Sequence, residues 1–209
     1  MSKIRLLLLS SLAAILLNVA VSAPAFATEF FNSAGTLITS PLNILGKGTV
    51  DAALKATISG VKVTITCVEV HATGSINNAS TMGLGAAILA LFIGCTVSGA
   101  GTGGCLVAKM ITLQAHVLAV GTSTAPELEF VPENEPAFVT ITLEDCTEQA
   151  ELNTSLPLTG AANAIVNNTA EEIVFTAAST SDLRFGGNKA SLTGRMKVEM
   201  EGGGKITVE

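Results

Sequence analysis

Apolar and polar residues alternate with a period of two along most of this chain, and this pattern restricts it to β-strands. In Val50–Ile58 and Val61–Cys67 the apolar side chains fall on one parity, and Ser59-Gly60 separates the two runs. Successive side chains of a strand point to opposite faces, so these runs predict a hairpin with one apolar face, on which Cys67 lies. The 3.6-residue period of an amphipathic helix does not recur.

The first 27 residues have the three parts of a secretory signal peptide. Lys3 and Arg5 precede an apolar run from Leu6 to Val21, and Ala25-Phe26-Ala27 supplies small residues for cleavage after Ala27. A single membrane helix is the alternative, but the uninterrupted apolar stretches are shorter than the roughly 18 residues that a span needs. The sequence predicts a secreted or cell-envelope protein with no membrane span in its mature part.

Four cysteines follow the predicted cleavage site: Cys67, Cys95, Cys105 and Cys146. An even number in an oxidising compartment predicts two disulfides. Three pairings are open. We favour Cys95–Cys105, which would close a glycine-rich loop, together with Cys67–Cys146, which would join distant strands.

The longest apolar run of the mature part is Gly83–Gly94. Its 12 residues are too few to span a bilayer as a helix, so we expect a core strand buried on both faces, although Thr81–Leu91 would also fit a short helix. A switch of apolar parity predicts a bulge or tight bend near Met110. Further predicted strands are Glu127–Val131, Phe138–Leu143, Ala150–Leu158, Glu172–Ala177, Ala190–Glu201 and Lys205–Glu209.

Strands at this spacing, joined by Gly, Asn, Ser and Pro, predict an all-β fold: an antiparallel β-sandwich or barrel with two disulfides and at most one short helix. No amphipathic helix of about 10–15 residues separates the strands, which disfavours a parallel α/β sheet. The Pro-flanked acidic stretch from Thr124 to Pro136 is the best candidate for a linker or long loop. We expect residues 28–209 to form a single domain, because a Cys67–Cys146 bridge would cross that stretch.

The mature part is acidic and lacks two of the three aromatic residue types. Removal of Lys3 and Arg5 with the signal segment changes the formal net charge from −6 to −8. Such a chain lacks the clustered Lys and Arg that nucleic-acid binding needs. Trp and Tyr are absent, which disfavours a sugar-binding platform, because such platforms depend on those rings.

Two patterns in the sequence are candidate sites of chemistry. Gly99, Gly101 and Gly104 match GxGxxG, but a strand-like sequence follows instead of a helix, so we interpret the motif as a flexible loop bounded by disulfides. His71 and His116, the only histidines, lie on the polar parity of their strands, where a surface role is commoner than a catalytic or metal-binding one. We predict no catalytic residue, metal site or cofactor from them.

Carboxylates form a third pattern, concentrated at Glu127, Glu129, Glu133 and Glu135 and again at Glu144, Asp145, Glu148 and Glu151. Paired carboxylates bind calcium or hydrolyse glycosides in other proteins. Glu127 and Glu129 share one parity opposite Leu128 and Phe130, as on a solvated strand face, and no DxDxDG loop is present. A calcium-binding or hydrolytic site at Glu127–Glu135 is therefore an alternative hypothesis. Asn78, Asn153 and Asn167 each begin an Asn-x-Ser/Thr sequence, a glycosylation acceptor in some hosts.

Several motifs together resemble one group of secreted proteins. They are VKVTITC ending at Cys67, FIGC ending at Cys95, a Gly/Ser/Thr loop to Cys105, a strand ending at Cys146, LRFGGNKASLTG at Leu183–Gly194 and GGG at Gly202–Gly204. This order resembles the four-cysteine, β-rich secreted proteins of unknown function that soil actinobacteria encode in many copies. The resemblance implies an exported β-fold and carries no activity or site residues. FVTITLEDC, ending at Cys146, more loosely resembles the cysteine-ending strand of fimbrial subunits.

Three hypotheses for function follow from the sequence. The first is a non-enzymatic structural or surface-interaction domain with a protein or cell-surface partner. The second is a fimbria-like subunit that assembles by strand addition. The third is the calcium-binding or hydrolytic domain built around Glu127–Glu135.

Overall fold

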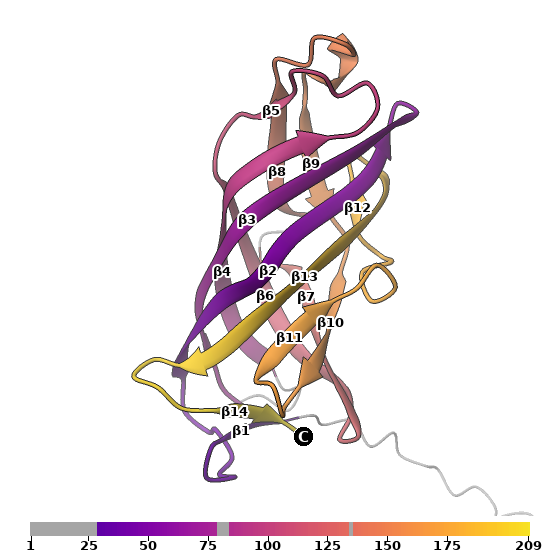
Figure 1. The fold of residues 1–209 in the computed structure, drawn as a ribbon. Coiled ribbons are helices and arrows are strands. Elements are labelled where there is room, and N and C mark those ends of the chain that lie inside the picture. The colour runs from indigo at the N-terminus through magenta and orange to yellow at the C-terminus, as the bar shows by residue number, and fades with distance from the viewer. Residues whose placement is uncertain (1–28, 79–83, 134–135) are drawn as a thin grey trace, which may run out of the picture.

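The computed structural model describes residues 29–78, 84–133 and 136–209, and this part of the chain is all-β, as the alternation predicts (Figure 1). The predicted signal segment Met1–Ala27 lies outside the described residues. The elements in chain order are β1 (Phe30–Asn32), β2 (Leu42–Ile58), β3 (Val61–Ile76), β4 (Leu84–Ser98), β5 (Leu106–Val107), β6 (Ile111–Thr122), β7 (Ala125–Pro132), β8 (Ala137–Glu144), the 3-10 helix η1 (Ala150–Leu152), β9 (Ser155–Thr159), β10 (Ala162–Asn167), β11 (Glu172–Phe175), β12 (Arg184–Phe185), β13 (Asn188–Met200) and β14 (Ile206–Val208).

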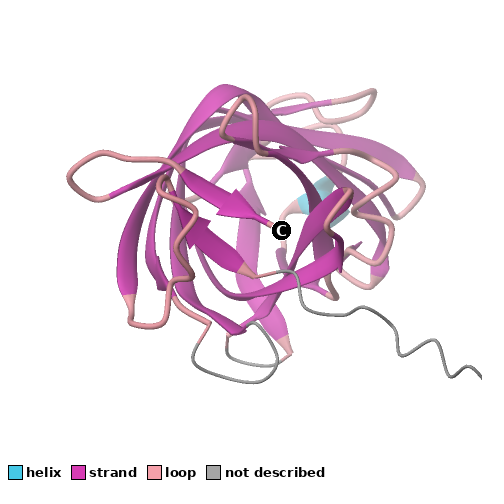
Figure 2. Ribbon diagram, turned by 90° about the horizontal axis from the view of Figure 1, so that it is seen from below, coloured by secondary structure: helices cyan, strands magenta, loops and turns pink. Residues whose placement is uncertain are grey.

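Eight of these strands close into an antiparallel barrel. Hydrogen-bonded neighbours follow the order β2-β3-β4-β6-β7-β10-β11-β13, and β13 pairs with β2, so the ring is complete. Figure 2, which looks at the molecule from one end, shows this ring in cross-section. Of the two architectures that the sequence predicts, the structure has the barrel.

Two smaller sheets lie at opposite ends of the barrel. β5, β8, β9 and β12 form a side sheet, which joins the barrel where β12 pairs with the start of β13. At the other end, β1 and β14 pair, with Phe30 opposite Val208 and Asn32 opposite Ile206 (Figure 1). We call this pair of strands the terminal plug, because Phe30 and Val208 are each buried in the apolar core.

Bulges move the apolar face from one parity to the other within single strands. In β3, Val63, Ile65 and Cys67 are buried, whereas beyond Cys67 the inward face passes to Val70, and Val68 is 63% exposed. Opposite this stretch β2 carries the extra residue, since it advances five positions from Lys47 to Ala52 while β3 advances four from Cys67 to His71. A bulge adds one residue to one strand, so every later side chain changes face. The predicted break near Met110 is confirmed, since β5 ends at Val107 and β6 begins at Ile111.

The long apolar run is a strand, but the expectation that it is buried on both faces is wrong. In β4, Ile88 and Ala90 are buried, whereas Leu89 between them is 36% exposed. The strand belongs to a closed barrel, whose outer face meets solvent. The short helix considered for Thr81–Leu91 is also wrong for residues 84–91, which lie in β4; residues 79–83 are outside the described part. No helix among the described residues has the length and apolar character needed to cross a membrane.

Two further expectations are corrected in the second half of the chain. The predicted linker Thr124–Pro136 contains β7, a barrel strand whose Leu128 is buried and which pairs with β6 and β10. Its acidic residues face outward, so their abundance reflects a solvated strand face. The predicted strand Ala150–Leu158 starts instead as η1, and strand pairing begins only at Ser155.

Both predicted disulfides form, but their pairing differs from the one we favoured. The bonds are Cys67–Cys95 and Cys105–Cys146. β3 and β4 are neighbours in the barrel, and their register places Cys67 directly opposite Cys95. Cys105 precedes β5 and Cys146 follows β8, and these two strands pair with each other. Cys67–Cys95 therefore crosslinks two neighbouring strands of the barrel, and Cys105–Cys146 crosslinks the ends of two paired strands of the side sheet.

Candidate ligand cavity in the barrel interior

The interior of the barrel contains two apolar cores, one towards each end. The core towards the side sheet includes Ile65 and Phe185, and the core towards the terminal plug includes Val117 and Val208. A cavity of about 130 Å³ lies between them, and residues of both cores line it. For comparison, an engineered apolar cavity of about 150 Å³ binds benzene. The space is therefore sufficient for one small molecule.

Phenylalanine side chains surround this cavity. Phe92, Phe130 and Phe175 pack against both cores, and Phe30 and Phe138 also line the space. The rings of Phe130 and Phe175 lie with their centroids 5.2 Å apart and their planes tilted by 53°. Aromatic faces and edges of this kind contact an apolar molecule without needing a polar group from it.

Small residues on the inward face keep the cavity open. Ala52, Ala72, Ala90 and Ala162 line it, where larger apolar side chains would fill the barrel. Gly46 of β2 also lines it, and a Cβ atom there would meet the Met196 side chain. A glycine within a strand often marks a place where another group approaches closely.

The terminal plug is held against the barrel by two asparagine side chains. Asn78 accepts a hydrogen bond from Phe30 N at 2.9 Å and donates to Phe30 O at 2.7 Å. Asn168 accepts from Val208 N at 3.0 Å and donates to Val208 O at 2.8 Å. Each amide group thus pairs with a plug residue as a neighbouring strand would, and the two together fix both strands of the plug.

At the other end of the molecule, Asn153 makes the same two-way contact with the backbone. It accepts from Cys146 N at 2.8 Å and donates to Cys146 O at 3.2 Å. This contact holds the segment after β8 beside η1, whose Leu152 is fully buried. Asn78 and Asn153, which the sequence marks as glycosylation acceptors, thus use their side-chain amides within the fold.

The barrel closes along the β11–β13 seam, which has only four residue pairs. Beyond the last pair, the hydroxyl of the fully buried Thr180 accepts a hydrogen bond from Leu192 N at 2.9 Å. Glu172 and Arg195 also line the cavity at this seam; Glu172 lies 3.5 Å from Arg195 Nε and accepts a hydrogen bond from Thr49 at 3.2 Å. Side-chain contacts therefore help to hold β11 against β13, in addition to the backbone hydrogen bonds between the two strands.

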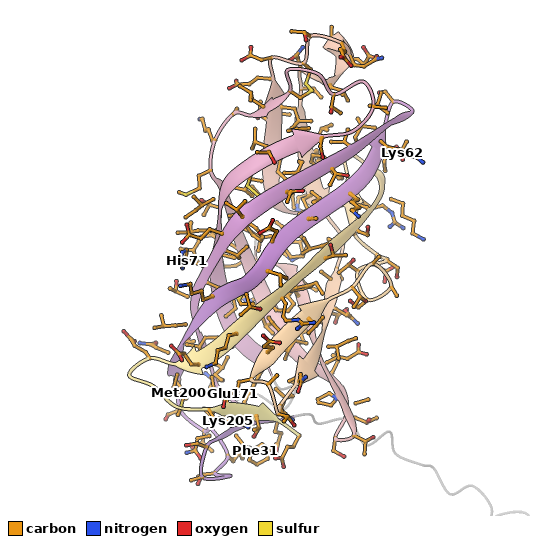
Figure 3. All side chains as sticks on the ribbon, viewed as in Figure 1. Phe31, Lys62, His71, Glu171, Met200 and Lys205 are labelled. Atoms are coloured by element: carbon orange, nitrogen blue, oxygen red, sulfur yellow. A yellow bond between two sulfur atoms is a disulfide. The ribbon has the colours of Figure 1, made fainter. Side chains whose placement is uncertain are left out.

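The polar residues that line the cavity lie on the β10, β11 and β13 side of the barrel. Three of them, Asn167, Asn168 and Glu171, belong to the end of β10 and the turn that leads to β11. Glu171 lies 3.6 Å from Lys197 and 3.9 Å from Lys205. Figure 3 shows Glu171 and Lys205 side by side at the plug end of the molecule. Lys197 and Lys205 do not themselves line the cavity; we call these two lysines together with Asn167, Asn168 and Glu171 the polar corner.

The structure does not bring the two histidines together. His71 of β3 is opposite Leu91 of β4, whereas His116 of β6 is opposite Ala87, four positions away along β4. His71 is on the outer surface, where its Nε2 lies 2.8 Å from Glu69 Oε1 and its side chain is 41% exposed. Its place beside Glu69 is as the sequence predicts.

The carboxylates of the Glu127–Glu135 region are spread along the outer face of β7. Glu127 and Glu129 are half-buried on the face opposite Leu128, as predicted, and Glu127 accepts a hydrogen bond from Asn163 at 3.4 Å. Glu135 lies outside the described residues. Within the described part of the chain, no three His, Cys, Asp or Glu side chains are grouped so that they could hold a metal ion.

The glycine-rich segment forms a tight loop stapled at Cys105. Gly99, Gly101 and Gly104 all have positive φ angles, of +145°, +83° and +77°. A Cβ atom at Gly99 would overlap Lys62 O, so this position requires glycine. The motif leads into strand β5, and its glycines allow the backbone angles of the turn. This agrees with its interpretation as a loop.

Sequence reasoning did not identify the cavity. Alternation locates an inward face but does not say whether its side chains fill the space that the closed sheet encloses. The signal was present in the inward glycine and alanines of β2, β3 and β4, which are small for a core. The hydrogen-bonding role of Asn78 and Asn168 was also missed, because it joins residues far apart in the chain.

No family model, no curated protein and no solved structure matches this chain. Function is therefore inferred from the geometry of the cavity and its surroundings.

Proposed function

We propose that this protein is an exported, non-enzymatic domain that binds a small apolar molecule in the interior of its barrel. The observation that carries the proposal is the cavity of about 130 Å³ between the two cores, lined mainly by phenylalanine and aliphatic side chains. Burial of an apolar surface is favourable by roughly 25 cal/mol per Å². A molecule of this class would gain that free energy without charged or hydrogen-bonding partners.

The chemistry of the lining supports binding over catalysis. Five of the seven phenylalanines after residue 27 line the cavity: Phe30, Phe92, Phe130, Phe138 and Phe175. His71 lies on the outer surface, and Glu127 and Glu129 lie on the outer face of β7. These three groups, which the sequence offers for general acid–base or metal chemistry, are not among the residues that line the cavity; its charged lining residues are Glu171, Glu172 and Arg195.

An extracellular or cell-envelope location is part of the proposal. Both disulfides are of the kind that persists in an oxidising compartment. The N-terminal pattern of a basic start, an apolar centre and a small-residue end supports export by a signal peptide.

Assembly by strand addition has less support from the geometry. Each of the eight barrel strands already pairs on both sides, so among the residues that the structure describes the barrel leaves no unpaired strand edge for a strand from another subunit. Size-exclusion chromatography of the mature protein tests this alternative, which predicts concentration-dependent polymers.

Binding is tested by titrating the mature protein with benzene and with short-chain alcohols, followed by NMR chemical shifts of the methyl groups that line the cavity. A bound apolar fluorescent dye gives a second readout, since the chain has no Trp or Tyr to add background. We expect saturable shifts confined to the inward residues. A folded protein that shows no saturable shift with any of these molecules would contradict the proposal.

Neighbouring alanines provide a matched pair of variants. Ala52 is buried and lines the cavity, whereas Ala53 points to the opposite face of β2. Ala52→Leu should fill part of the cavity and abolish binding, and Ala53→Leu should leave binding unchanged. Because overpacking costs typically 1–3 kcal/mol, the milder Ala90→Val serves if Ala52→Leu does not fold.

A further inference from the structure

We propose that the ligand of this cavity is a small, uncharged molecule with a single aromatic ring, held against Phe92, Phe130 and Phe175. This inference rests on the proposed function and narrows it from apolar molecules in general to one chemical class. Three features of the structure carry it: the placement of the three rings around the barrel, the small residues opposite two of them and the pairing of the charged residues in the lining.

The three phenylalanines belong to the boundary between the two cores, where the cavity lies. Each of them packs against both cores and lines the cavity. They come from β4, β7 and β11, and in the ring of strands β6 lies between the first two and β10 between the last two. A ligand between the cores therefore has an aromatic side chain on more than one side.

Small cross-strand neighbours leave parts of these rings uncovered. Phe175 of β11 lies directly opposite Gly194 of β13, and Phe130 of β7 lies directly opposite Ala162 of β10. Directly opposite residues have Cβ atoms only about 4.5–5.5 Å apart, so a large neighbour would cover a ring that glycine or alanine leaves free. Phe130 and Phe175 contact each other, with ring centroids 5.2 Å apart, so an aromatic ligand would lie beside this pair as a third ring.

Contacts between rings favour an aromatic ligand over an aliphatic one of similar size. The face of an aromatic ring is negative and its edge is positive, so rings that meet edge to face or offset attract each other beyond the effect of the area that they bury. For one pair of rings this attraction corresponds to about two- to tenfold in affinity. The volume of about 130 Å³ suits one ring, because an apolar cavity of about 150 Å³ holds benzene.

The charged residues of the lining already have partners within the protein. They are Glu171, Glu172 and Arg195. Glu171 lies within 4 Å of Lys197 and Lys205, and Glu172 lies 3.5 Å from Arg195 Nε. A charged ligand would have to compete with these pairs or enter the apolar space between the cores unpaired, which is unfavourable. The lining therefore favours an uncharged molecule.

Benzene and cyclohexane test the aromatic class, because both are uncharged hydrocarbon rings with the same number of carbons. Each is titrated into the mature protein and followed by NMR, and the ratio of their dissociation constants is compared between the wild-type protein, Phe130→Leu and Phe175→Leu. Differences in the hydration of the two probes cancel in this comparison. Loss of one ring should lower the preference for benzene about two- to tenfold, and an unchanged ratio in both variants would overturn the aromatic class.

Two control variants separate the loss of a ring from other effects. Leu113 also lines the cavity and packs against both cores, so Leu113→Val enlarges the space without removing a ring. Phe185 is fully buried in the core towards the side sheet and is not among the lining residues, so Phe185→Leu reports general destabilisation. Neither control should change the ratio. A change in either control as large as that in Phe175→Leu would overturn the assignment.

The position of the ligand is measured in the wild-type protein, so it does not depend on whether a variant folds. Bound benzene should show nuclear Overhauser contacts to the ring protons of Phe92, Phe130 and Phe175, and contacts to none of them would overturn the site. Benzoate and benzylammonium test the charge. Both should bind at least about tenfold more weakly than toluene, and an affinity equal to that of toluene would overturn the preference for an uncharged ligand.

The outcomes also separate this inference from the function on which it rests. If benzene and cyclohexane both bind and Ala52→Leu abolishes the binding of both, but loss of a ring leaves their ratio unchanged, the cavity is a ligand site and only its chemical class is wrong. If no probe binds to the folded protein, the proposed function fails and this inference fails with it.

Discussion

Asn168 and Val208 are joined by two hydrogen bonds that run in opposite directions between one side-chain amide and one backbone residue. Asn78 holds Phe30 in the same way. These contacts attach the first and last described strands to the end of the barrel nearest the polar corner. They make the terminal plug the element whose opening would expose that end of the cavity.

Replacement of Asn168 by alanine is expected to loosen the plug. The backbone groups of Val208 lose both partners, at a cost of about 1–3 kcal/mol for a buried group left unpaired. Hydrogen exchange at β1 and β14 should accelerate, and the association and dissociation rates of a bound alkyl probe should rise together. NMR exchange measurements report both quantities.

The control for this variant is Asn153→Ala, which removes the same pair of contacts at Cys146, beyond the side sheet. It should lower the free energy of unfolding by a similar amount and leave the probe's rates unchanged. Equal acceleration in both variants would show that general destabilisation, and not the plug, controls access.

Thr180 is expected to contribute to closure of the barrel. Its hydroxyl accepts a hydrogen bond from Leu192 N just beyond the last pair of the β11–β13 seam, and its side chain is fully buried. Thr180→Val keeps the shape and leaves Leu192 N unpaired, so the free energy of unfolding should fall by about 1–3 kcal/mol in urea denaturation. Thr180→Ser retains the hydroxyl and should lose less; an equal loss would assign the effect to packing.

Each disulfide is expected to stabilise the protein by about 3.5–4 kcal/mol in the chain-entropy model, because the two loops span 28 and 41 residues. Replacement of Cys67 and Cys95 by alanine, and separately of Cys105 and Cys146, should lower the denaturation midpoint by similar amounts. Peptide mapping under non-reducing conditions checks the pairing itself. An unchanged midpoint in both double variants would contradict the prediction.

Gly99 is expected to tolerate no side chain. Gly99→Ala would bring a Cβ atom against Lys62 O, in addition to the strain of a positive φ, so a loss of about 1–3 kcal/mol is expected in thermal or urea unfolding. Gly60→Ala is the matched control, since Gly60 also has a positive φ, of +83°, with no atom within 4 Å of the added Cβ. A larger loss at Gly99 than at Gly60 is expected from the clash with Lys62 O together with its more extreme φ of +145°, and equal losses would contradict the prediction.

The strands were predictable because their pattern is local. The hairpin of β2 and β3, the break near Met110 and the outward placement of Glu127 and Glu129 all follow from parity along short stretches. The choice between sandwich and barrel was not predictable, because it depends on whether β13 pairs with β2 as well as with β11. That pairing joins residues near opposite ends of the described chain.

The disulfide pairing shows the same limit. Proximity in the chain favoured Cys95–Cys105, but pairing in the structure follows the register between β3 and β4, which sets Cys67 opposite Cys95. That register is constant on both sides of Cys67, but nothing in the alternation of either strand alone fixes where the two strands align. The cavity could not be predicted for a related reason. Its volume depends on how the inward side chains of all eight barrel strands pack together, and no single strand shows this.

The closing role of β13 also sets the order in which the molecule can assemble. The Cys67–Cys95 hairpin forms from neighbouring strands and can be crosslinked early, whereas the ring closes only when the last barrel strand reaches the first. Contacts between distant segments slow folding, because the intervening chain must be ordered first. The enclosed space between the two cores is therefore complete only after β13 has paired with both β2 and β11, so we expect unfolded or partly folded chains to lack it.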